Sequence, residues 1–356
     1  MELADPQYTY HLPESLIAKE PAVPRDAARL FVYDTARDAV ALDTFAHLGD
    51  HLPPQSLLVL NDTKVVPARA LLRKAATGGK VEVLFLVNEW DGKGPVPAIV
   101  DRKVDVGARI AFGARTFIVA RQDENIFWFA PEFPVHELIP ALMKRGVTPI
   151  PKYIKGSGLG ESALRKKYQS VFGETPASVA APTASLHFTD RLLRWLAAHG
   201  VKKAFVTLHV GMGTFAPVTK EDVARGTLHA EHLSISAASR ARIRAQKDAG
   251  RPVVAVGTTV VRTLESQADA LLAQGLSSSP RTAIDAETRM FIRPPYRFKA
   301  VDAMVTNFHL PGTSLMMLVQ AFLEHKGARK DIVALYEKAI KEKFRFYSFG
   351  DGMLIK

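Results

Sequence analysis

The sequence predicts a large α/β domain, with a mostly parallel or mixed sheet, into which a small antiparallel β-barrel is inserted. Residues 66–148 hold short β-rich segments at hairpin spacing, separated by glycine turns and without a helical period. From residue 149 onward the chain alternates strand, loop and helix, a pattern typical of α/β proteins. Because residues 1–65 are also strand-rich and apolar, we expect 1–65 and 149–356 to form one domain and 66–148 the inserted barrel.

The first part of the chain leads from the large domain into the barrel. Residues 57–67 read Leu-Leu-Val-Leu-Asn-Asp-Thr-Lys-Val-Val-Pro, which predicts a buried strand that runs into a polar turn. Apolar and β-branched residues then recur in short runs bounded by Gly and Asp. We expect barrel strands over 81–87, 97–100, 109–112, 116–120 and 125–130.

Three strand-to-helix units are expected in the rest of the large domain. Thr189 and Asp190 are typical helix N-caps, and the apolar periodicity after them stops at Gly200, before a predicted strand over 204–210. A strand over 252–256 is followed by Gly257-Thr258-Thr259 and a helix that continues through 264–272. A strand over 303–308 precedes a helix over 313–325.

Composition excludes several classes of protein. The 356 residues include no cysteine, which rules out disulfide scaffolds, thiolate nucleophiles, cysteine-ligated zinc and iron–sulfur clusters. The first residues lack a signal peptide's basic and apolar regions, and no stretch reaches the roughly 18 apolar residues of a membrane span. We therefore expect a cytoplasmic protein with no membrane contact.

Basic residues are in excess, 47 Lys and Arg against 36 Asp and Glu, and they cluster. Residues 144–167 contain seven basic side chains and one acid, Glu161, while 289–299 contain four basic side chains, no acid and three aromatic rings. Cations beside rings that can stack on bases favour an unpaired RNA partner. A solvated basic face remains the alternative.

Histidines gather at the predicted strand ends, and a histidine can act as acid or base near neutral pH. In an extended segment His229 and Glu231 share a face, which makes them a candidate acid/base pair. A three-histidine metal site is the alternative. We expect no metal. The histidines in question are His187, His209, His229, His232 and His309.

Two glycine motifs follow predicted strands. Residues 211–216 match a loose dinucleotide-binding fingerprint, but Pro217 follows where that fingerprint needs a helix. Gly211 and Gly213 let a backbone approach a ligand or simply make a tight turn. Gly257-Thr258-Thr259 opens a helix directly, with Arg262 in its first turn. This arrangement indicates an anion site or an ordinary helix N-cap.

Several long segments resemble one family along essentially the whole chain. The matching segments are Asn61-Asp62-Thr63-Lys64-Val65-Val66-Pro67-Ala68-Arg69, Val179-Ala180-Ala181-Pro182-Thr183-Ala184-Ser185-Leu186-His187-Phe188-Thr189, residues 205–215, residues 254–266, Thr306-Asn307-Phe308-His309-Leu310-Pro311, and Phe346-Tyr347-Ser348-Phe349-Gly350-Asp351. They resemble the S-adenosylmethionine:tRNA ribosyltransferase-isomerases of queuosine biosynthesis, whose fold is an α/β domain carrying an inserted β-barrel.

The resemblance implies a reaction. The ribosyl part of S-adenosylmethionine, the co-substrate, moves to the aminomethyl group of 7-aminomethyl-7-deazaguanine at the wobble position of tRNA and is isomerised, giving epoxyqueuosine with release of adenine and methionine. Two single positions and two short segments depart from the family pattern. In one segment the family's Pro-Pro-Tyr becomes Pro151-Lys152-Tyr153, which adds positive charge. Lys64 replaces an arginine and loses its bidentate fork, Ser185 replaces a glycine, and Arg293-Pro294-Pro295-Tyr296 replaces Tyr-Pro-Gly-Tyr.

Roles for individual residues follow from the resemblance as hypotheses. A base near the sulfonium would remove a C5′ proton to form an ylid that eliminates adenine, after which the substrate amine attacks the sugar. The base is expected among His187, His209, His229 and Glu231, with Asp62 and Asp351 as hydroxyl or amine partners. The cofactor is expected against Gly211, Gly213, Thr214, Gly257, Thr258, Thr259 and Arg262. Substrate contacts are expected from Asn307, His309, Lys152, Arg165, Lys166, Arg293 and Tyr296.

The protein is expected to act as a monomer on tRNA. Two other classes remain open at this point. A non-catalytic RNA-binding protein would need only the basic face, and a Rossmann-type methyltransferase or dehydrogenase would need a helix where Pro217 stands.

Overall fold

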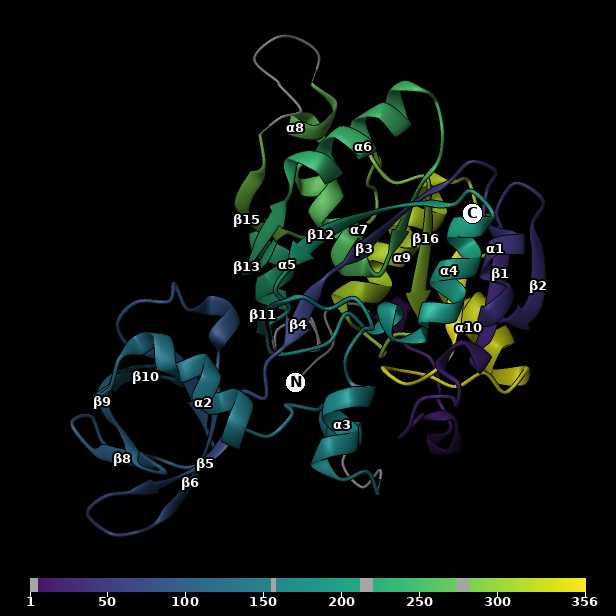
Figure 1. The fold of residues 1–356 in the computed structure, drawn as a ribbon. Coiled ribbons are helices and arrows are strands. Elements are labelled where there is room, and N and C mark those ends of the chain that lie inside the picture. Colours follow the sequence, from purple (N-terminus) through teal and green to yellow (C-terminus); the bar gives the residue numbers. More distant parts are fainter. Residues whose placement is uncertain (1–5, 155–157, 212–219, 274–281) are drawn as a thin grey trace.

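The computed structural model describes residues 6–154, 158–211, 220–273 and 282–356, which form a barrel beside a larger α/β domain (Figure 1). The larger domain is built on a nine-stranded sheet with the order β15-β13-β12-β3-β14-β16-β17-β1-β2. In that order its strands are Ile284–Met290, Thr227–Ile235, Lys202–Leu208, Leu57–Asn61, Val253–Val256, Ala303–Asn307, Gly352–Ile355, Arg29–Asp34 and Ala39–Thr44.

The sheet is mixed, in agreement with the prediction. Its centre, β12-β3-β14-β16, is parallel. Antiparallel pairs join β13 to β12 and β15 to β13 at one edge, β17 to β16 beyond the centre, and β2 to β1 at the other edge. The carboxyl ends of the four central strands therefore meet at one edge of the sheet, where α/β proteins commonly place their ligands.

Helices cover both faces of the sheet because successive strand side chains point to opposite sides. Val59 and Ala255 belong to a core with α6 to α10, whereas Leu58 and Val254 pack with α4 and α1. The helices are α1 Leu48–His51, α2 Leu138–Arg145, α3 Glu161–Lys167, α4 Asp190–Ala198, α5 Lys220–Arg225, α6 Ala237–Asp248, α7 Thr258–Ser266, α8 Ala268–Leu272, α9 Ser314–His325 and α10 Ile332–Lys341.

Two predicted helices can be compared directly with the structure. Thr189 caps α4 as expected, since its hydroxyl accepts a hydrogen bond from the Leu192 amide at 3.1 Å. The helix expected to run without a break from Gly257 to residue 272 is instead divided into α7 and α8 at Gln267. The Ser266 hydroxyl donates to the Thr263 carbonyl, a side-chain bond that competes with helix continuation.

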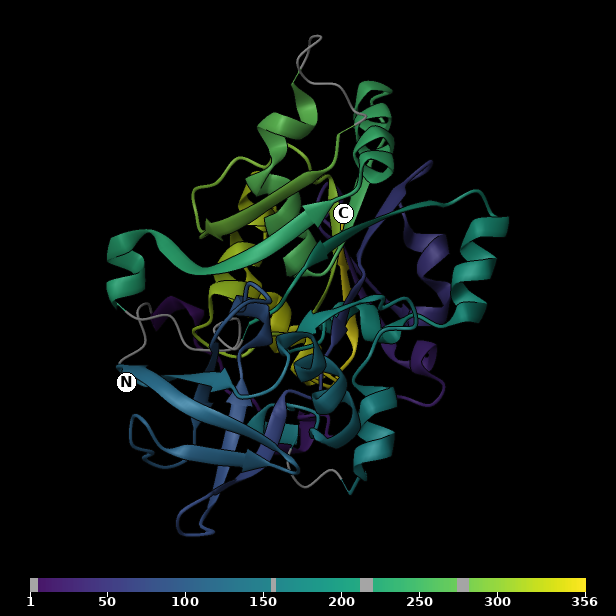
Figure 2. The same cartoon turned by 60° about the vertical axis from the view of Figure 1, so that its left-hand side comes forward.

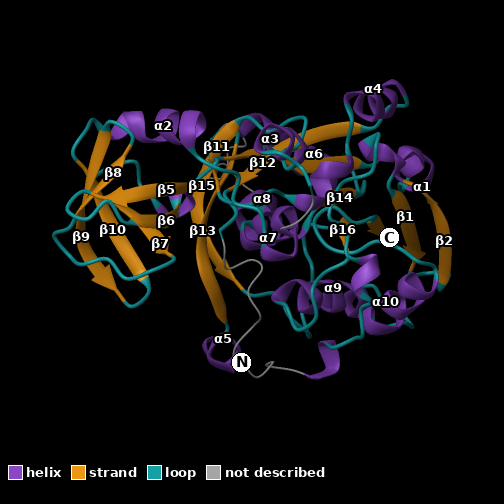
Figure 3. Ribbon diagram, turned by 90° about the horizontal axis from the view of Figure 1, so that it is seen from below, coloured by secondary structure: helices purple, strands orange, loops and turns teal. Residues whose placement is uncertain are grey.

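The barrel is closed by six antiparallel strands in the order β10-β7-β6-β5-β8-β9, and it stands apart at one side of the molecule in Figure 3. The strands are β5 Arg69–Lys74, β6 Lys80–Phe85, β7 Val96–Val100, β8 Arg109–Phe112, β9 Arg115–Asp123 and β10 Ile126–Pro131. Phe85, Phe117 and Phe129 contact one another in its core. The expected strand over 81–87 ends early, because Val87 turns into the short helix η5 (Val87–Glu89).

The chain enters and leaves the barrel at adjacent points. Arg69 and Val147 exchange backbone hydrogen bonds of 3.2 and 2.7 Å. Gly146 is required there, because a Cβ at this position would collide with the Pro67 carbonyl oxygen. Just before the barrel, β4 (Thr63–Val65) pairs in parallel with β11 (Thr175–Ser178). None of the described helices is long and apolar enough to cross a membrane.

Candidate active site

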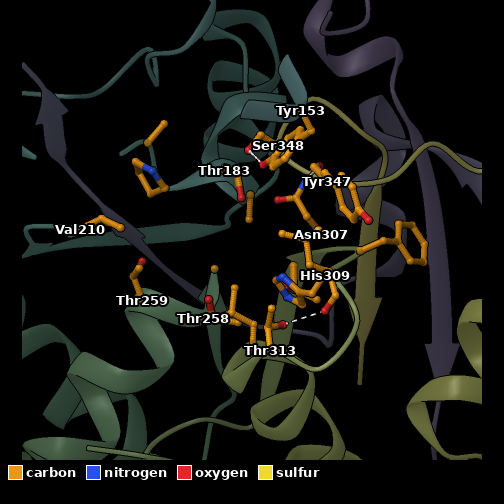
Figure 4. Close-up of a pocket in the computed structure, with 18 residues that line it drawn as sticks. Tyr153, Thr183, Val210, Thr258, Thr259, Asn307, His309, Thr313, Tyr347 and Ser348 are labelled. Atoms are coloured by element: carbon orange, nitrogen blue, oxygen red, sulfur yellow. Dashed lines mark hydrogen bonds between the residues drawn. The ribbon is translucent and has the colours of Figure 1, made fainter. Parts of the chain in front are cut away.

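A pocket of about 580 Å³ lies at the carboxyl ends of the central strands, and we call it the strand-end pocket (Figure 4). Of the described residues that line it, none is Asp, Glu, Lys or Arg. It is therefore uncharged but rich in hydroxyl, amide and imidazole groups. The polar lining residues are Tyr153, Thr183, Thr258, Thr259, Thr306, Asn307, His309, Thr313, Tyr347 and Ser348.

One wall of the pocket is the start of α7. β14 ends at Val256, Gly257 takes a positive φ of 95°, and α7 begins at the next residue. The first N–H groups of a helix have no intrahelical partner, and the helix dipole favours an anion beside them. Asn61 donates to the Thr259 hydroxyl at 3.2 Å and so fixes that side chain. The helix start at which the sequence predicts an anion site, Gly257-Thr258-Thr259, therefore lies in the wall of the pocket.

Asn307 ends β16 and directs its amide into the pocket (Figure 4). Its Nδ2 donates to His187 Nε2 at 3.1 Å and to the Tyr347 carbonyl at 3.3 Å. Its Oδ1 is buried and has no hydrogen-bond partner among the described residues. An unpaired buried acceptor is costly, so Oδ1 is available to a donor on a ligand.

His187 stands behind Asn307 and does not line the pocket. Because Nε2 accepts the Asn307 amide hydrogen, the ring proton is on Nδ1. Burial lowers the pKa of His187 to about 4, and the ring lies 4.8 Å from that of Phe45. The structure therefore shows a neutral histidine that supports Asn307.

His309 contributes its ring to the pocket wall (Figure 4). Its Nε2 is 2.8 Å from the Thr306 hydroxyl, and burial lowers its pKa to about 3. The Tyr336 hydroxyl accepts from its backbone amide at 3.0 Å, and the Tyr10 hydroxyl donates to its carbonyl. The imidazole is therefore held in place and neutral at pH 7.

A second hollow, which we call the interdomain cleft, separates the barrel from the sheet edge; Figure 2 shows the barrel beside the long strand β13. Its walls are η5 with Trp90 on one side and β13 and β15 on the other. The described lining residues are Val87, Asn88, Glu89, Trp90, Asp91, Ala177, His209, His229, Ala230, His232, Glu287 and Arg289.

Three of the histidines meet in the cleft. His209 Nδ1 is 2.8 Å from the Thr63 hydroxyl, and burial lowers the pKa of His209 to about 4. Its ring stacks on His232 at 5.8 Å, and His232 contacts Asp285 at 2.7 Å. His229 is exposed in the cleft wall. His209 and His229 therefore lie together, apart from His187 and His309.

Glu231 and Arg262, expected as base and cofactor contact, bind each other. They form a buried ion pair in which Arg262 Nη1 donates to Glu231 Oε2. Glu231 Oε1 also accepts from the Gly211 amide at 3.2 Å, and Arg262 Nε donates to the Met290 carbonyl at 3.1 Å. Since Glu231 lies on β13 and Arg262 on α7, the pair joins the cleft wall to the pocket helix.

The two expected aspartates lie outside the strand-end pocket. Asp351 is buried and accepts the backbone amides of Arg29 and Arg345 at 3.0 and 2.8 Å. Asp62 accepts from the Thr207 hydroxyl at 2.6 Å, and burial raises its pKa. Both carboxylates are engaged by the fold in this structure.

The expected RNA contacts are spread over the surface. Arg165 is bonded internally to Glu161 and to the carbonyls of Met143 and Gly146. The Tyr296 hydroxyl donates to Glu265 at 3.2 Å. Lys166 and Arg293 are exposed, and Lys152 begins the short helix η7 (Lys152–Ile154). Gly213 and Thr214 lie outside the described residues.

Sequence reasoning missed several lining residues. Thr183 and Ser348 lie within the family-like segments, so their place in those segments was an available signal. Tyr153 reaches the pocket from a distant segment and bonds the Ser348 hydroxyl at 2.6 Å. Asn88 and Trp90 carried no sequence signal. In the part of the chain that is described, no three His, Asp or Glu side chains converge as a metal site would require.

Comparisons with known proteins agree with this architecture. The profile of the family described as queuosine biosynthesis protein matches residues 6–355. A protein of Anaeromyxobacter dehalogenans (strain 2CP-C) named S-adenosylmethionine:tRNA ribosyltransferase-isomerase is 42% identical over 364 aligned residues, covering 100% of this chain and 99% of its own. A protein of the same name from Magnetococcus marinus is 44% identical, covering 98% of this chain and 93% of its own.

A crystal structure is also similar. The S-adenosylmethionine tRNA ribosyltransferase of Thermotoga maritima is 31% identical and superimposes with a TM-score of 0.55, covering 98% of this chain and 100% of its own. The profile match, the full-length relatives and the shared architecture lead to one assignment. The chain belongs to the queuosine biosynthesis protein family.

Proposed function

We propose that the protein is an S-adenosylmethionine:tRNA ribosyltransferase-isomerase. It would transfer the ribosyl part of S-adenosylmethionine to the aminomethyl group of 7-aminomethyl-7-deazaguanine at the tRNA wobble position. Isomerisation of the sugar would give epoxyqueuosine, with adenine and methionine released. The family assignment supports the activity, and the strand-end pocket supports the place of the co-substrate.

The observation that carries this proposal is the unpaired Oδ1 of Asn307 in an uncharged pocket. S-adenosylmethionine has a cationic sulfonium, and the described lining offers it acceptors without a repelling Lys or Arg. The N-terminus of α7, with Thr258 and Thr259, suits the carboxylate of its methionine part.

His309 is the proposed base, because its neutral imidazole lies in this pocket whereas His187 lies behind Asn307. The C5′ proton would pass to His309 while the bond between the ribose and adenine breaks, and the departing adenine nitrogen would take up a proton from the resulting imidazolium or from water. The substrate amine then forms a bond to the sugar and loses a proton to water, and the bond between carbon and sulfur breaks with its electron pair on sulfur to release methionine. Positioning and a correctly placed base are the contributions expected of the protein.

The tRNA nucleotide would approach through the interdomain cleft. Val210 lines the strand-end pocket and His209 lines the cleft, so the two hollows adjoin at consecutive residues. The Cα atoms of consecutive residues are about 3.8 Å apart. A base held in the cleft is thus within reach of a sugar held in the pocket.

Adenine release tests the proposal. The protein is incubated with S-adenosylmethionine and either tRNA carrying the aminomethyl-deazaguanine base or tRNA carrying guanine. Adenine release that depends on the modified base is expected. Binding of tRNA without adenine release would indicate a non-catalytic RNA-binding protein, and formation of S-adenosylhomocysteine would indicate a methyltransferase; either result contradicts the proposal.

A further inference from the structure

The buried side chain of Asn88 makes no hydrogen bond of good geometry within the described residues; the polar group beside it is the Glu89 carboxylate, on whose pKa it acts against the larger, raising effect of burial. Asn88 is 7% exposed, and neither Nδ2 nor Oδ1 has a hydrogen-bond partner among the described residues. Buried amides normally satisfy both groups, and leaving both unpaired destabilises the fold. An amide kept in this state implies a partner that arrives from outside.

Asn88 lies where the barrel faces the large domain. It belongs to η5, which follows barrel strand β6 and contacts β13 and β11. The Gly211 backbone stands against it, since a Cβ on Gly211 would come within 2.8 Å of Asn88 Nδ2. The amide is therefore confined at the wall of the interdomain cleft.

The surrounding cleft has the parts of a nucleotide site. Trp90 is half-buried in the same wall and offers a ring for stacking, with its Nε1 held by the Lys93 carbonyl at 3.0 Å. Arg289 is exposed in the opposite wall and can meet a phosphate. Unpaired bases are recognised by this combination of stacking, cation and polar edge contacts.

The neighbouring residue sets which base edge fits. The Asn88 amide can donate through Nδ2, and the adjoining Glu89, exposed in the cleft, only accepts when ionised. A guanine-type edge presents an acceptor, O6, beside two donors, N1–H and the 2-amino group. Adenine presents a donor at N6 beside an acceptor at N1, and so mismatches this pair.

We propose that Asn88 and Glu89 read the Watson–Crick edge of the target base, Asn88 donating to its O6 and Glu89 accepting from its N1–H and 2-amino groups. The assignment rests on the proposed function, since it supposes that a deazaguanine nucleotide enters the cleft. Deazaguanine keeps the guanine edge while its seven-position substituent points away from that edge. Recognition and reaction can therefore occur on opposite sides of one base.

The test uses Asn88→Leu, which keeps the approximate volume and removes both polar atoms. Two anticodon stem-loops are compared, one with the aminomethyl-deazaguanine base at the wobble position and one with adenine. We expect kcat/KM for the first stem-loop to fall by roughly 10- to 100-fold, and the preference in binding over the adenine stem-loop to shrink by a similar factor. The KM for S-adenosylmethionine should not change.

Melting temperature separates recognition from a structural role. Removing an unpaired buried amide should leave Tm unchanged or raise it. Asn125→Leu, in the exposed turn between β9 and β10, is the matched control and should retain full activity. A second variant, Gly211→Ala, should displace the Asn88 amide and lower kcat/KM for the RNA in the same sense.

The outcomes distinguish this inference from the function on which it rests. If the unaltered protein releases no adenine with the modified stem-loop, the proposed function fails. If it does, but Asn88→Leu stays within twofold in both kcat/KM and base preference, Asn88 does not read the base. A lowered Tm in Asn88→Leu, together with equal losses of binding to the modified and the adenine stem-loops, would likewise overturn the inference, because it would show a structural role.

Discussion

The strand-end pocket and the interdomain cleft adjoin but have opposite electrostatic character. The pocket is lined by neutral groups, and its imidazole, His309, is held uncharged by burial. The cleft exposes Glu89, Glu287 and Arg289 to solvent. Neutral directional groups suit a small ligand whose orientation matters. The charged residues described in the cleft are three acids, Glu89, Asp91 and Glu287, and one cation, Arg289, so the cleft suits the N–H donors of a base edge with a single phosphate beside Arg289. One molecule thus offers two kinds of recognition side by side.

The largest effect is expected on stability, when the buried ion pair between Glu231 and Arg262 is broken. Glu231→Gln leaves the Arg262 guanidinium buried without its counter-charge, and we expect the free energy of unfolding to fall by about 3–5 kcal/mol, measured by urea denaturation. His229→Gln, on the same strand but exposed, is the control and should unfold like the unaltered protein. Full stability of Glu231→Gln with loss of turnover would instead restore Glu231 as a catalytic candidate.

Within the pocket, Asn307→Leu should lower kcat/KM for S-adenosylmethionine by about 100-fold, because it removes the unpaired acceptor that the proposed ligand would meet. The affinity for the RNA stem-loop, measured by fluorescence anisotropy, should stay within twofold. Thr313→Ser, which keeps a hydroxyl in the pocket, provides a mild comparison. Equal losses for both ligands would contradict the division between pocket and cleft.

Acid should weaken the fold through the buried histidines on both sides. The pKa of His309 is lowered to about 3, and those of His187 and His209 to about 4, below the ordinary 6.5. The unfolded chain therefore binds protons first, so the stability is complete above pH 6.5 and is lost as the pH falls toward 4. Between these pKa values, each histidine adds about 1.4 kcal/mol per pH unit to the slope of the free energy of unfolding against pH.

Urea denaturation between pH 7 and 4.5 measures this slope. His309→Gln should reduce it by about one histidine's share. An unchanged slope in His309→Gln would mean that this histidine is protonated in the folded protein.

The smallest effect is expected at the cleft rim. Arg289→Ala should weaken stem-loop binding only a few-fold, because the residue is exposed and would meet a single phosphate in the proposed complex. The slope of log affinity against log salt should fall by about 0.7. Binding of S-adenosylmethionine should be independent of salt in both proteins. A salt slope that Arg289→Ala leaves unchanged would place the phosphate contact elsewhere.

Local sequence patterns were sufficient for much of the fold. Short β-rich segments between glycine turns predicted five of the six barrel strands, missing β5, and Gly257-Thr258-Thr259 after a buried strand predicted a helix start. These features depend on neighbouring residues, so a sequence displays them. The break at Gln267 follows Ser266, whose hydroxyl donates to the Thr263 carbonyl, and it was not visible in the periodicity.

Partnerships between distant residues could not be predicted in the same way. Glu231 and Arg262 were expected to face ligands separately, yet they neutralise each other when β13 and α7 pack together. Asp351 was expected as an active-site carboxylate, but it accepts the backbone amides of Arg29, at the start of β1, and of Arg345, in the loop after α10. Asn88 is a candidate because its amide is buried without a hydrogen-bond partner of good geometry among the described residues. That condition depends on the folded surroundings, so no local sequence pattern predicts it.

The adjacent entry and exit of the barrel have a consequence for protein engineering. Because Arg69 and Val147 are paired through their backbones, a short turn could replace the chain between them without stretching the connection from β3 to β11. The shortened enzyme would retain every polar residue of the strand-end pocket and lose Asn88, Glu89 and Trp90. If the proposed function is correct, excision of one module would thus convert a two-substrate catalyst into a minimal receptor for its nucleoside co-substrate.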